Sequence, residues 1–238
     1  MSRADRRRTE KLHGRGQSRP ASALKPLFDE AVVHHRAGRL IEARQVYQQI
    51  LAIDPHHAET HHLLGLIAYR TGALQEAVEL LSQATQENQS QPTYWFNFGV
   101  VLQKQGKATE ALSAYERAVA LHPQYPEAHS NVGNVLMESG QLEGAAAAYQ
   151  RALRIRPEYV EAHNNLGVVL KEQGKLDEAR ASYEQAIRLA PNHLEAHCNL
   201  GSLLMDQGKL DQAIACFDRA LQIKPDYVKA MYHLAFAL

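Results

Sequence analysis

Residues 159–191 read YVEAHNNLGVVLKEQGKLDEARASYEQAIRLAP, and their apolar positions follow helical spacing twice. Apolar side chains three or four positions apart lie on one helix face, so each set predicts an amphipathic helix, the first of about 14 residues. Gly174 ends the first helix and Pro191 ends the second. The two sets are Ala162, Leu166, Val169 and Leu170, then Leu176, Ala179, Tyr183, Ala186 and Ile187. The stretch therefore predicts a hairpin of two helices.

The glycine and proline residues that end these helices recur every 34 residues along the chain. Two glycine series keep this step and use 11 of the 14 glycines: Gly38, Gly72, Gly106, Gly140, Gly174 and Gly208, and Gly65, Gly99, Gly133, Gly167 and Gly201. Other residue types keep it too: Ala43, Ala77, Ala111, Ala145, Ala179 and Ala213; Tyr47, Tyr115, Tyr149, Tyr183 and Phe217; Pro55, Pro123, Pro157, Pro191 and Pro225. A fixed period of this length indicates a helical repeat protein.

Each glycine series has a physical reason. Gly174 and its equivalents follow the first helix, where a left-handed residue is needed and glycine has no steric penalty. Gly167 and its equivalents lie inside helical patterns, where glycine costs about 1 kcal/mol relative to alanine. We therefore expect a neighbouring helix to approach closely there, with the alanine series as the matching small surface. A single hairpin cannot bury its apolar face, whereas stacked hairpins can.

With Leu–Gly in the first helix, alanine and then an aromatic residue in the second, and a closing proline, the unit resembles the tetratricopeptide repeat. The resemblance covers about residues 24–238 and implies an all-α fold, a right-handed α-solenoid whose first helices line the concave side. Six full repeats are predicted to begin near 24, 58, 92, 126, 160 and 194, with a half repeat at 228–238 and a basic disordered tail at 1–23. Leu81 replaces the aromatic residue, Gln89 replaces the proline, and the family's early tryptophan occurs once, as Trp95.

An asparagine stands two residues before the helix glycine in four successive repeats: Asn97, Asn131, Asn165 and Asn199. Asparagine is an indifferent helix former, so its recurrence asks for a reason. Its amide carries both a donor and an acceptor, which suits a peptide backbone of any sequence. The series resembles the asparagine ladder of the repeat region in O-linked N-acetylglucosamine transferases, which implies an extended peptide held in the concave groove. The alternative is that these amides bond to neighbouring helices within the solenoid.

Charged side chains are predicted to lie near this groove. Glu127, Glu161 and Glu195 recur on the first helices, and Lys104 and Lys171 are placed deeper in. An acidic rim would favour basic partner segments, whereas the simpler interpretation is a solvated helix face.

No pattern in the chain predicts a catalytic centre, a metal site or a cofactor. His57 and His61 have a spacing that metal ligands use on helices. The slot of His61 is nevertheless filled by histidine in other repeats, so repeat packing explains it better: His129, His163 and His197. The chain contains no glycine-rich phosphate loop, nucleophile elbow or zincin motif, and we expect no enzyme activity.

Composition sets the broad class. Hydrophobic residues make up 45% and charged residues 22%, with a formal net charge of zero, as in a folded soluble protein. No window approaches the roughly 18 consecutive apolar residues of a membrane helix. Cys198 and Cys216 are too few for a disulfide framework and fit small buried side chains, which favours a reducing cytoplasm.

The two ends of the sequence leave alternatives open. Residues 1–19 hold seven basic side chains, which suit an anionic surface, nucleic acid, or simply a solubilising arm. The stretch lacks interleaved aromatic residues, so we do not expect nucleic acid as a partner. The final half repeat has a packing stripe without a second helix to cover it, which predicts a continuing chain, a partner or self-association there, or fraying.

The sequence thus predicts a non-catalytic protein–protein interaction scaffold that holds extended polypeptide segments in its groove. The alternative is the substrate-recognition portion of a larger enzyme, an O-linked N-acetylglucosamine type of protein glycosyltransferase whose catalytic domain lies outside this chain.

Overall fold

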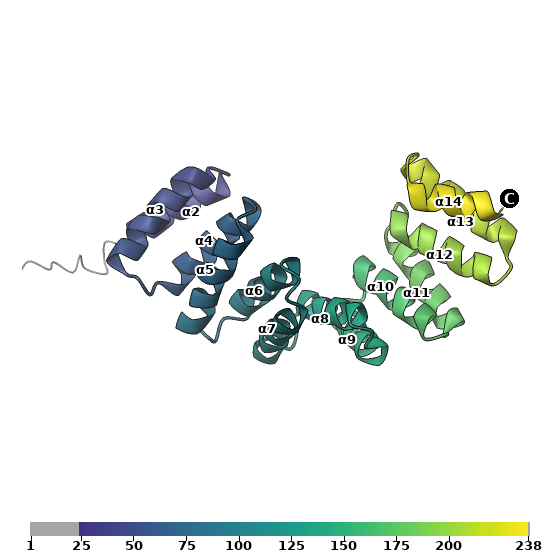
Figure 1. The fold of residues 1–238 in the computed structure, drawn as a ribbon, viewed down its shortest axis with the longest axis horizontal. Helices are drawn as coiled ribbons and strands as arrows, with labels where there is room; N and C mark the ends of the chain where they lie inside the picture. Colours follow the sequence, from purple (N-terminus) through teal and green to yellow (C-terminus); the bar gives the residue numbers. More distant parts are fainter. Residues whose placement is uncertain (1–23, 238) are drawn as a thin grey trace, which may run out of the picture. The chain divides into compact units, whose positions relative to one another are not determined.

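The computed structural model describes residues 24–237, and every regular element within them is an α-helix (Figure 1). The predicted tail, residues 1–23, lies outside the described residues. The helices are α2 (Leu24–Arg36), α3 (Leu40–Ile53), α4 (Ala58–Arg70), α5 (Leu74–Glu87), α6 (Pro92–Lys104), α7 (Ala108–Leu121), α8 (Pro126–Glu138), α9 (Leu142–Ile155), α10 (Val160–Glu172), α11 (Leu176–Leu189), α12 (Leu194–Asp206), α13 (Leu210–Ile223) and α14 (Val228–Ala237). Even-numbered helices are the first of each hairpin, and they begin 34 residues apart.

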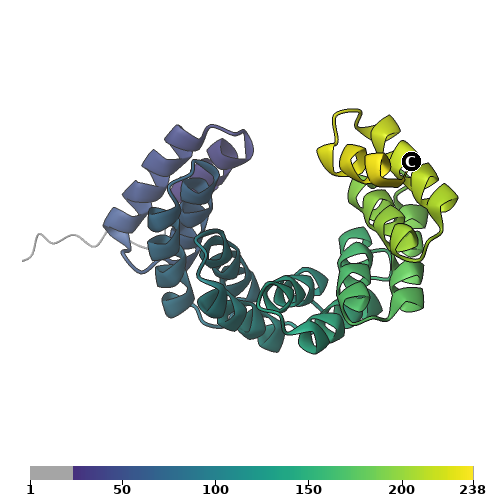
Figure 2. The same ribbon diagram turned by 45° about the vertical axis from the view of Figure 1, so that its right-hand side comes forward.

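The chain divides into two compact units, unit 1 up to Val101 and unit 2 from Leu102 onward, so the boundary falls within α6. In unit 1, α2 to α5 pack in sequence order, each helix against the next. In unit 2, α7 to α14 do the same (Figure 2). Consecutive packing of helix pairs confirms the predicted all-α repeat solenoid.

The helix glycines allow an aromatic ring to lie directly against the first helix of its hairpin. A Cβ atom at Gly167 would be 2.6 Å from Tyr183 Cε1, and one at Gly201 would be 2.7 Å from Phe217 Cε1. Both rings are fully buried and belong to the core of unit 2. The close approach was predicted correctly, but its partner was not. The closest atoms belong to the aromatic series rather than to the alanines.

The second glycine series ends the first helices in the left-handed conformation, as predicted. Gly174 has a φ of 75° and donates to Lys171 O at 2.9 Å, and Lys175 N donates to Leu170 O at 2.9 Å. These bonds cap carbonyls that the helix end leaves without partners, and they set the turn into α11.

The histidine slot of the first helix has a structural function. His129 Nε2 bonds to Pro123 O at 3.0 Å, and the same bond recurs one and two repeats later, from His163 to Pro157 O at 2.8 Å and from His197 to Pro191 O at 3.0 Å. Trp95 Nε1 donates to Gln89 O at 3.0 Å, six residues back in the same way. A ring N–H therefore ties each of these first helices to the residue that closes the preceding repeat.

Candidate functional site

In unit 2, the first helices lie next to one another and form a continuous surface, which we call the first-helix face. Helix α10 contacts α8 on one side and α12 on the other, and α12 contacts α14. Asn131, Asn165 and Asn199 lie on this face at the same position of α8, α10 and α12, and each is partly exposed. The structure therefore brings three of the four predicted asparagines into one unit.

A chain of side-chain hydrogen bonds connects these asparagines through two that the sequence analysis missed, Asn164 and Asn134. Asn199 Nδ2 donates to Asn164 Oδ1 at 3.0 Å, and Asn164 Nδ2 donates to Asn165 Oδ1 at 3.1 Å. Asn165 Nδ2 then donates to Asn134 Oδ1 at 3.1 Å, and Asn134 Nδ2 lies 3.4 Å from Asn131 Oδ1. We call this set the amide network. Asn165 and Asn199 thus bond to the neighbouring first helix, whereas Asn131 bonds within α8.

The amide network leaves part of each predicted asparagine unused. A primary amide has two N–H donors and a carbonyl oxygen with two lone pairs. Within the described residues, Asn199 uses one N–H group and accepts one hydrogen bond, and Asn131 only accepts one. Asn165 donates to Asn134, accepts from Asn164 and is also hydrogen-bonded to the Tyr149 hydroxyl. A lone pair of all three amides and a donor of Asn131 and Asn199 therefore stay available at partly exposed side chains. Asn164, by contrast, is only 7% exposed.

A buried tyrosine of α9 is hydrogen-bonded to the amide network. Tyr149 is fully buried, and its hydroxyl donates to Asn134 Oδ1 at 2.6 Å. Burial raises the pKa of Tyr149 above its ordinary value, so the phenol keeps its proton at physiological pH. Asn134 Oδ1 thus accepts from both Tyr149 and Asn165, which fixes the orientation of that amide.

Two lysines, Lys171 of α10 and Lys229 of α14, lie close to Asn199 at one end of the amide network. Lys229 Nζ donates to Asn199 Oδ1 at 2.9 Å. Lys171 Nζ donates to Ser202 Oγ at 3.0 Å and lies 2.7 Å from Asp206 Oδ2. These lysines line a cavity of about 370 Å³ together with Asn199 and Ser202.

In unit 1 the fourth asparagine, Asn97, is held by an imidazole instead. Its Nδ2 donates to His62 Nε2 at 2.8 Å, and the His62 ring stacks on Tyr94 at a centroid distance of 4.4 Å. Burial lowers the pKa of His62 to about 4, so the ring is neutral and can accept this bond. Leu63 occupies the asparagine slot one repeat earlier and lines a cavity of about 550 Å³ with Phe28, Val33 and Tyr47.

The predicted charged residues differ in their surroundings. Glu127 forms an ion pair with Arg156, whose guanidinium also lies 4.9 Å from the centre of the Tyr159 ring. Glu161 and Glu195 are exposed, and Glu195 is 3.8 Å from His193 Nδ1. Lys104 is exposed at the end of α6. Because Glu127 is paired, it contributes little net charge to an acidic rim.

Within residues 24–237, no helix has the length and apolar character to cross a bilayer. The same residues contain no group of three side chains placed to hold a metal ion. Cys198 is buried and Cys216 is half-buried, and burial raises the pKa of both thiols.

Stacked helix hairpins with a 34-residue step define a helical repeat protein. Models of this class match the sequence: one described as TPR repeat matches residues 104–139 and 133–174, and two described as tetratricopeptide repeat match residues 34–96 and 164–228. The chain belongs to the tetratricopeptide repeat family. No curated protein matches it in sequence.

Solved structures confirm the fold. YrrB, described as a TPR protein with an unusual peptide-binding site, is 22% identical with a TM-score of 0.67, and the match covers 81% of this chain and 98% of YrrB. PilF of Pseudomonas aeruginosa is 17% identical with a TM-score of 0.78, over 90% of this chain and 98% of PilF. TTC0263, a TPR protein of Thermus thermophilus, is 26% identical with a TM-score of 0.59, over 76% of this chain and 98% of TTC0263.

Proposed function

We propose that this chain is a non-catalytic protein-interaction scaffold, and that the first-helix face of unit 2 holds an extended polypeptide segment. The observation that carries this proposal is the unused hydrogen-bonding capacity of Asn131, Asn165 and Asn199. Each amide is fixed from one side by the amide network, while an acceptor lone pair of all three and a donor of Asn131 and Asn199 stay available at partly exposed positions. Fixed amides lose little side-chain entropy on binding, which favours affinity.

The repeat geometry suits a peptide backbone. Neighbouring packed helices lie roughly 10 Å apart, and an extended chain rises about 3.3 Å per residue. One asparagine would therefore meet the backbone about every third residue. Because a backbone presents an N–H and a C=O whatever its side chains, such contacts bind peptides of many sequences. Selectivity would come from side chains that reach other parts of the face.

The description of YrrB as a TPR protein with a peptide-binding site supports this proposal, since its repeats share the fold of this chain. The ion pair of Glu127 with Arg156 argues against strong selection for basic peptides. We place substrate selection for a glycosyltransferase second to the scaffold function, because it rests on the asparagine series alone.

The test uses peptides selected on the intact chain from a random library of linear sequences. Their Kd is then measured by fluorescence polarisation for the intact chain and for a variant with Asn131→Ala, Asn165→Ala and Asn199→Ala. Three lost hydrogen bonds of about 1 kcal/mol each predict a Kd about 100-fold higher for the variant.

Asn192→Ala supplies the matched control. It removes an exposed asparagine side chain in the connection from α11 to α12, outside the amide network. We expect this control to raise the Kd by less than about threefold. If the triple variant binds the selected peptides as tightly as the intact chain, the asparagines serve packing alone and the proposal is wrong.

A further inference from the structure

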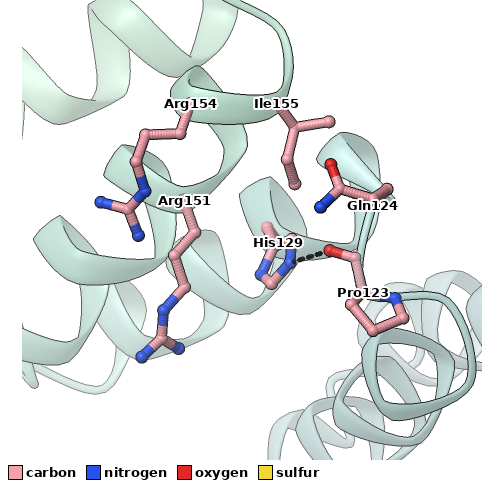
Figure 3. A pocket seen from close by; sticks show the side chains of 6 residues that line it. All are labelled: Pro123, Gln124, His129, Arg151, Arg154 and Ile155. Carbon is pink, nitrogen blue, oxygen red and sulfur yellow. Dashed lines mark hydrogen bonds between the residues drawn. The ribbon is translucent and has the colours of Figure 1, made fainter.

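A second pocket in unit 2 shares no residue with the amide network and carries different chemistry. It has a volume of about 370 Å³ and lies between the connection from α7 to α8, the helix α8 and the end of α9 (Figure 3). Its lining residues are Pro123, Gln124, His129, Arg151, Arg154 and Ile155. We call it the arginine pocket.

The two arginines of this pocket are not paired with other side chains of the described part of the chain. Within residues 24–237, no carboxylate lies within ion-pair distance of Arg151 or Arg154, and neither makes a side-chain hydrogen bond. Figure 3 shows both side chains extending to the same side of α9, Arg151 beside His129 and Arg154 further from it. Two positive charges three residues apart on a helix are neighbours and repel each other. The pocket therefore gathers positive charge that its described surroundings do not balance.

Equivalent positions in the next two repeats are built differently. One repeat later, Gln185 and Arg188 take the places of Arg151 and Arg154, and Arg188 donates to Gln185. Two repeats later, Arg219 donates to Asn192 at 3.0 Å and to Gln222 at 3.1 Å. Each of these positions has a single arginine whose guanidinium is already engaged. Of these three successive repeats, the first alone combines two arginines with free donors.

We propose that the arginine pocket binds a phosphate group in its doubly charged form. A carboxylate offers two oxygens and one charge, which a single guanidinium fork satisfies. A phosphate monoester offers three terminal oxygens and nearly two charges, which matches two forks and a charge of two. Gln124 lines the opposite side of the pocket and carries no charge that would oppose an anion. His129 Nε2 is engaged with Pro123 O and holds that wall of the pocket in place.

The phosphate has two sources, the free ion and a phosphorylated side chain of a partner polypeptide. The experiment follows the arginine Nε–H signals of the full chain by NMR, in about 0.15 M salt, during titration with inorganic phosphate. A second titration uses a short phosphoserine peptide, and a third uses the same peptide without phosphate. We expect the signals of Arg151 and Arg154 to shift and to saturate with phosphate-bearing ligands only. Binding of the peptide at least about tenfold tighter than free phosphate identifies a phosphorylated partner, and equal affinities identify the free ion.

Arg117 provides the matched control, because it has the position of Arg151 one repeat earlier while Ala120 has that of Arg154. Arg154→Gln should weaken binding at least about tenfold, and Arg117→Gln should leave it unchanged. Both positions are exposed, so neither change is expected to unfold the chain. Signals of Arg117 that shift as strongly as those of Arg151, or shifts that never saturate, would show unspecific screening and overturn the proposal.

Discussion

In units 1 and 2, the asparagine of one first helix bonds to the preceding first helix, but the acceptor differs in its chemistry. In unit 1, His62 accepts a hydrogen bond from Asn97, and in unit 2, Asn164 accepts one from Asn199 at the same 35-residue separation. His62 and Asn164 are equivalent positions of their repeats, and both are buried. The series of hydrogen bonds stops at His62, which accepts from Asn97 at one ring nitrogen. The Asn164 amide accepts from Asn199 and also donates to Asn165, so the series continues. A hydrogen-bonded chain across several helices thus needs the amide.

The units also differ in what lies against the helix glycine. In unit 2 the neighbour is a tyrosine or phenylalanine ring, and in unit 1 it is Leu81, whose Cγ would lie 2.7 Å from a Cβ at Gly65. A ring can move only as a rigid plate within a packed core, whereas a leucine can change its rotamer. The same repeat pattern is therefore packed more rigidly in unit 2.

The largest expected effect comes from exchanging these glycines for alanine. Gly167→Ala forces a methyl group against the Tyr183 ring, and we expect a loss of about 2 kcal/mol of stability after the gain in helix propensity. Gly65→Ala should change stability by less than about 1 kcal/mol, because Leu81 can adjust. Urea unfolding followed by circular dichroism measures both. Equal midpoints for the two variants would contradict the difference in rigidity.

The second prediction concerns the pH dependence of unit 1. The pKa of His62 is about 4 in the folded chain and 6.5 in its ordinary state, because burial disfavours the charged ring. Between these values the unfolded chain binds a proton that the folded chain excludes, so stability falls as the pH falls from about 7 to about 4. We expect a loss of about 2 kcal/mol from this residue, since some solvent reaches the ring.

Trp95 is the only tryptophan, and it lies in unit 1, so its fluorescence reports on the unfolding of that unit. His62→Gln should reduce the change in the urea midpoint between about pH 7 and about pH 4.5, and His35, whose pKa burial also lowers, keeps a part of it. Asn164→Gln, the matched change in unit 2, should leave the pH dependence of the Trp95 signal intact. A His62→Gln variant with an undiminished pH dependence would place the titrating group elsewhere.

Much of the fold follows from features that recur in every repeat. Gly174 predicted a helix end because its conformation is required locally, and the structure has it there. The partner of Gly167 was not predictable, since which side chain of α11 meets the glycine depends on how two helices cross. The hydrogen bond from the histidine position to the preceding repeat could also not be predicted from the sequence. Trp95 and the histidines of the other repeats are different residue types, but each donates a ring N–H to a carbonyl oxygen six residues earlier.

The candidate site was predicted only in part. The recurring asparagines were visible, but Asn134 and Asn164 each occur once at their repeat positions, so periodicity could not find them. The adjacent pair of Asn164 and Asn165 was the available signal. The arginine pocket was missed for a different reason: the lack of a carboxylate near its two arginines becomes visible only when the surrounding side chains are placed.

Several predictions stay untested by the structure: the peptide-binding residues, the cytoplasmic location, the resemblance to the repeats of O-linked N-acetylglucosamine transferases, the division into a tail and one solenoid, and a partner for the last helix. Helix α14 packs on α13 and α12 and exposes Val228, Met231, Tyr232 and Phe236.

The central claim is that the asparagines of unit 2 bind the backbone of a peptide. It is tested most directly by replacing single backbone amides of a selected peptide with esters, which removes one N–H donor at a time. We predict that the Kd rises about three- to tenfold at positions spaced about three residues apart, and that the triple asparagine-to-alanine variant has lost this sensitivity. Esters that have no effect at any position, or the same effect on the variant, would contradict the claim.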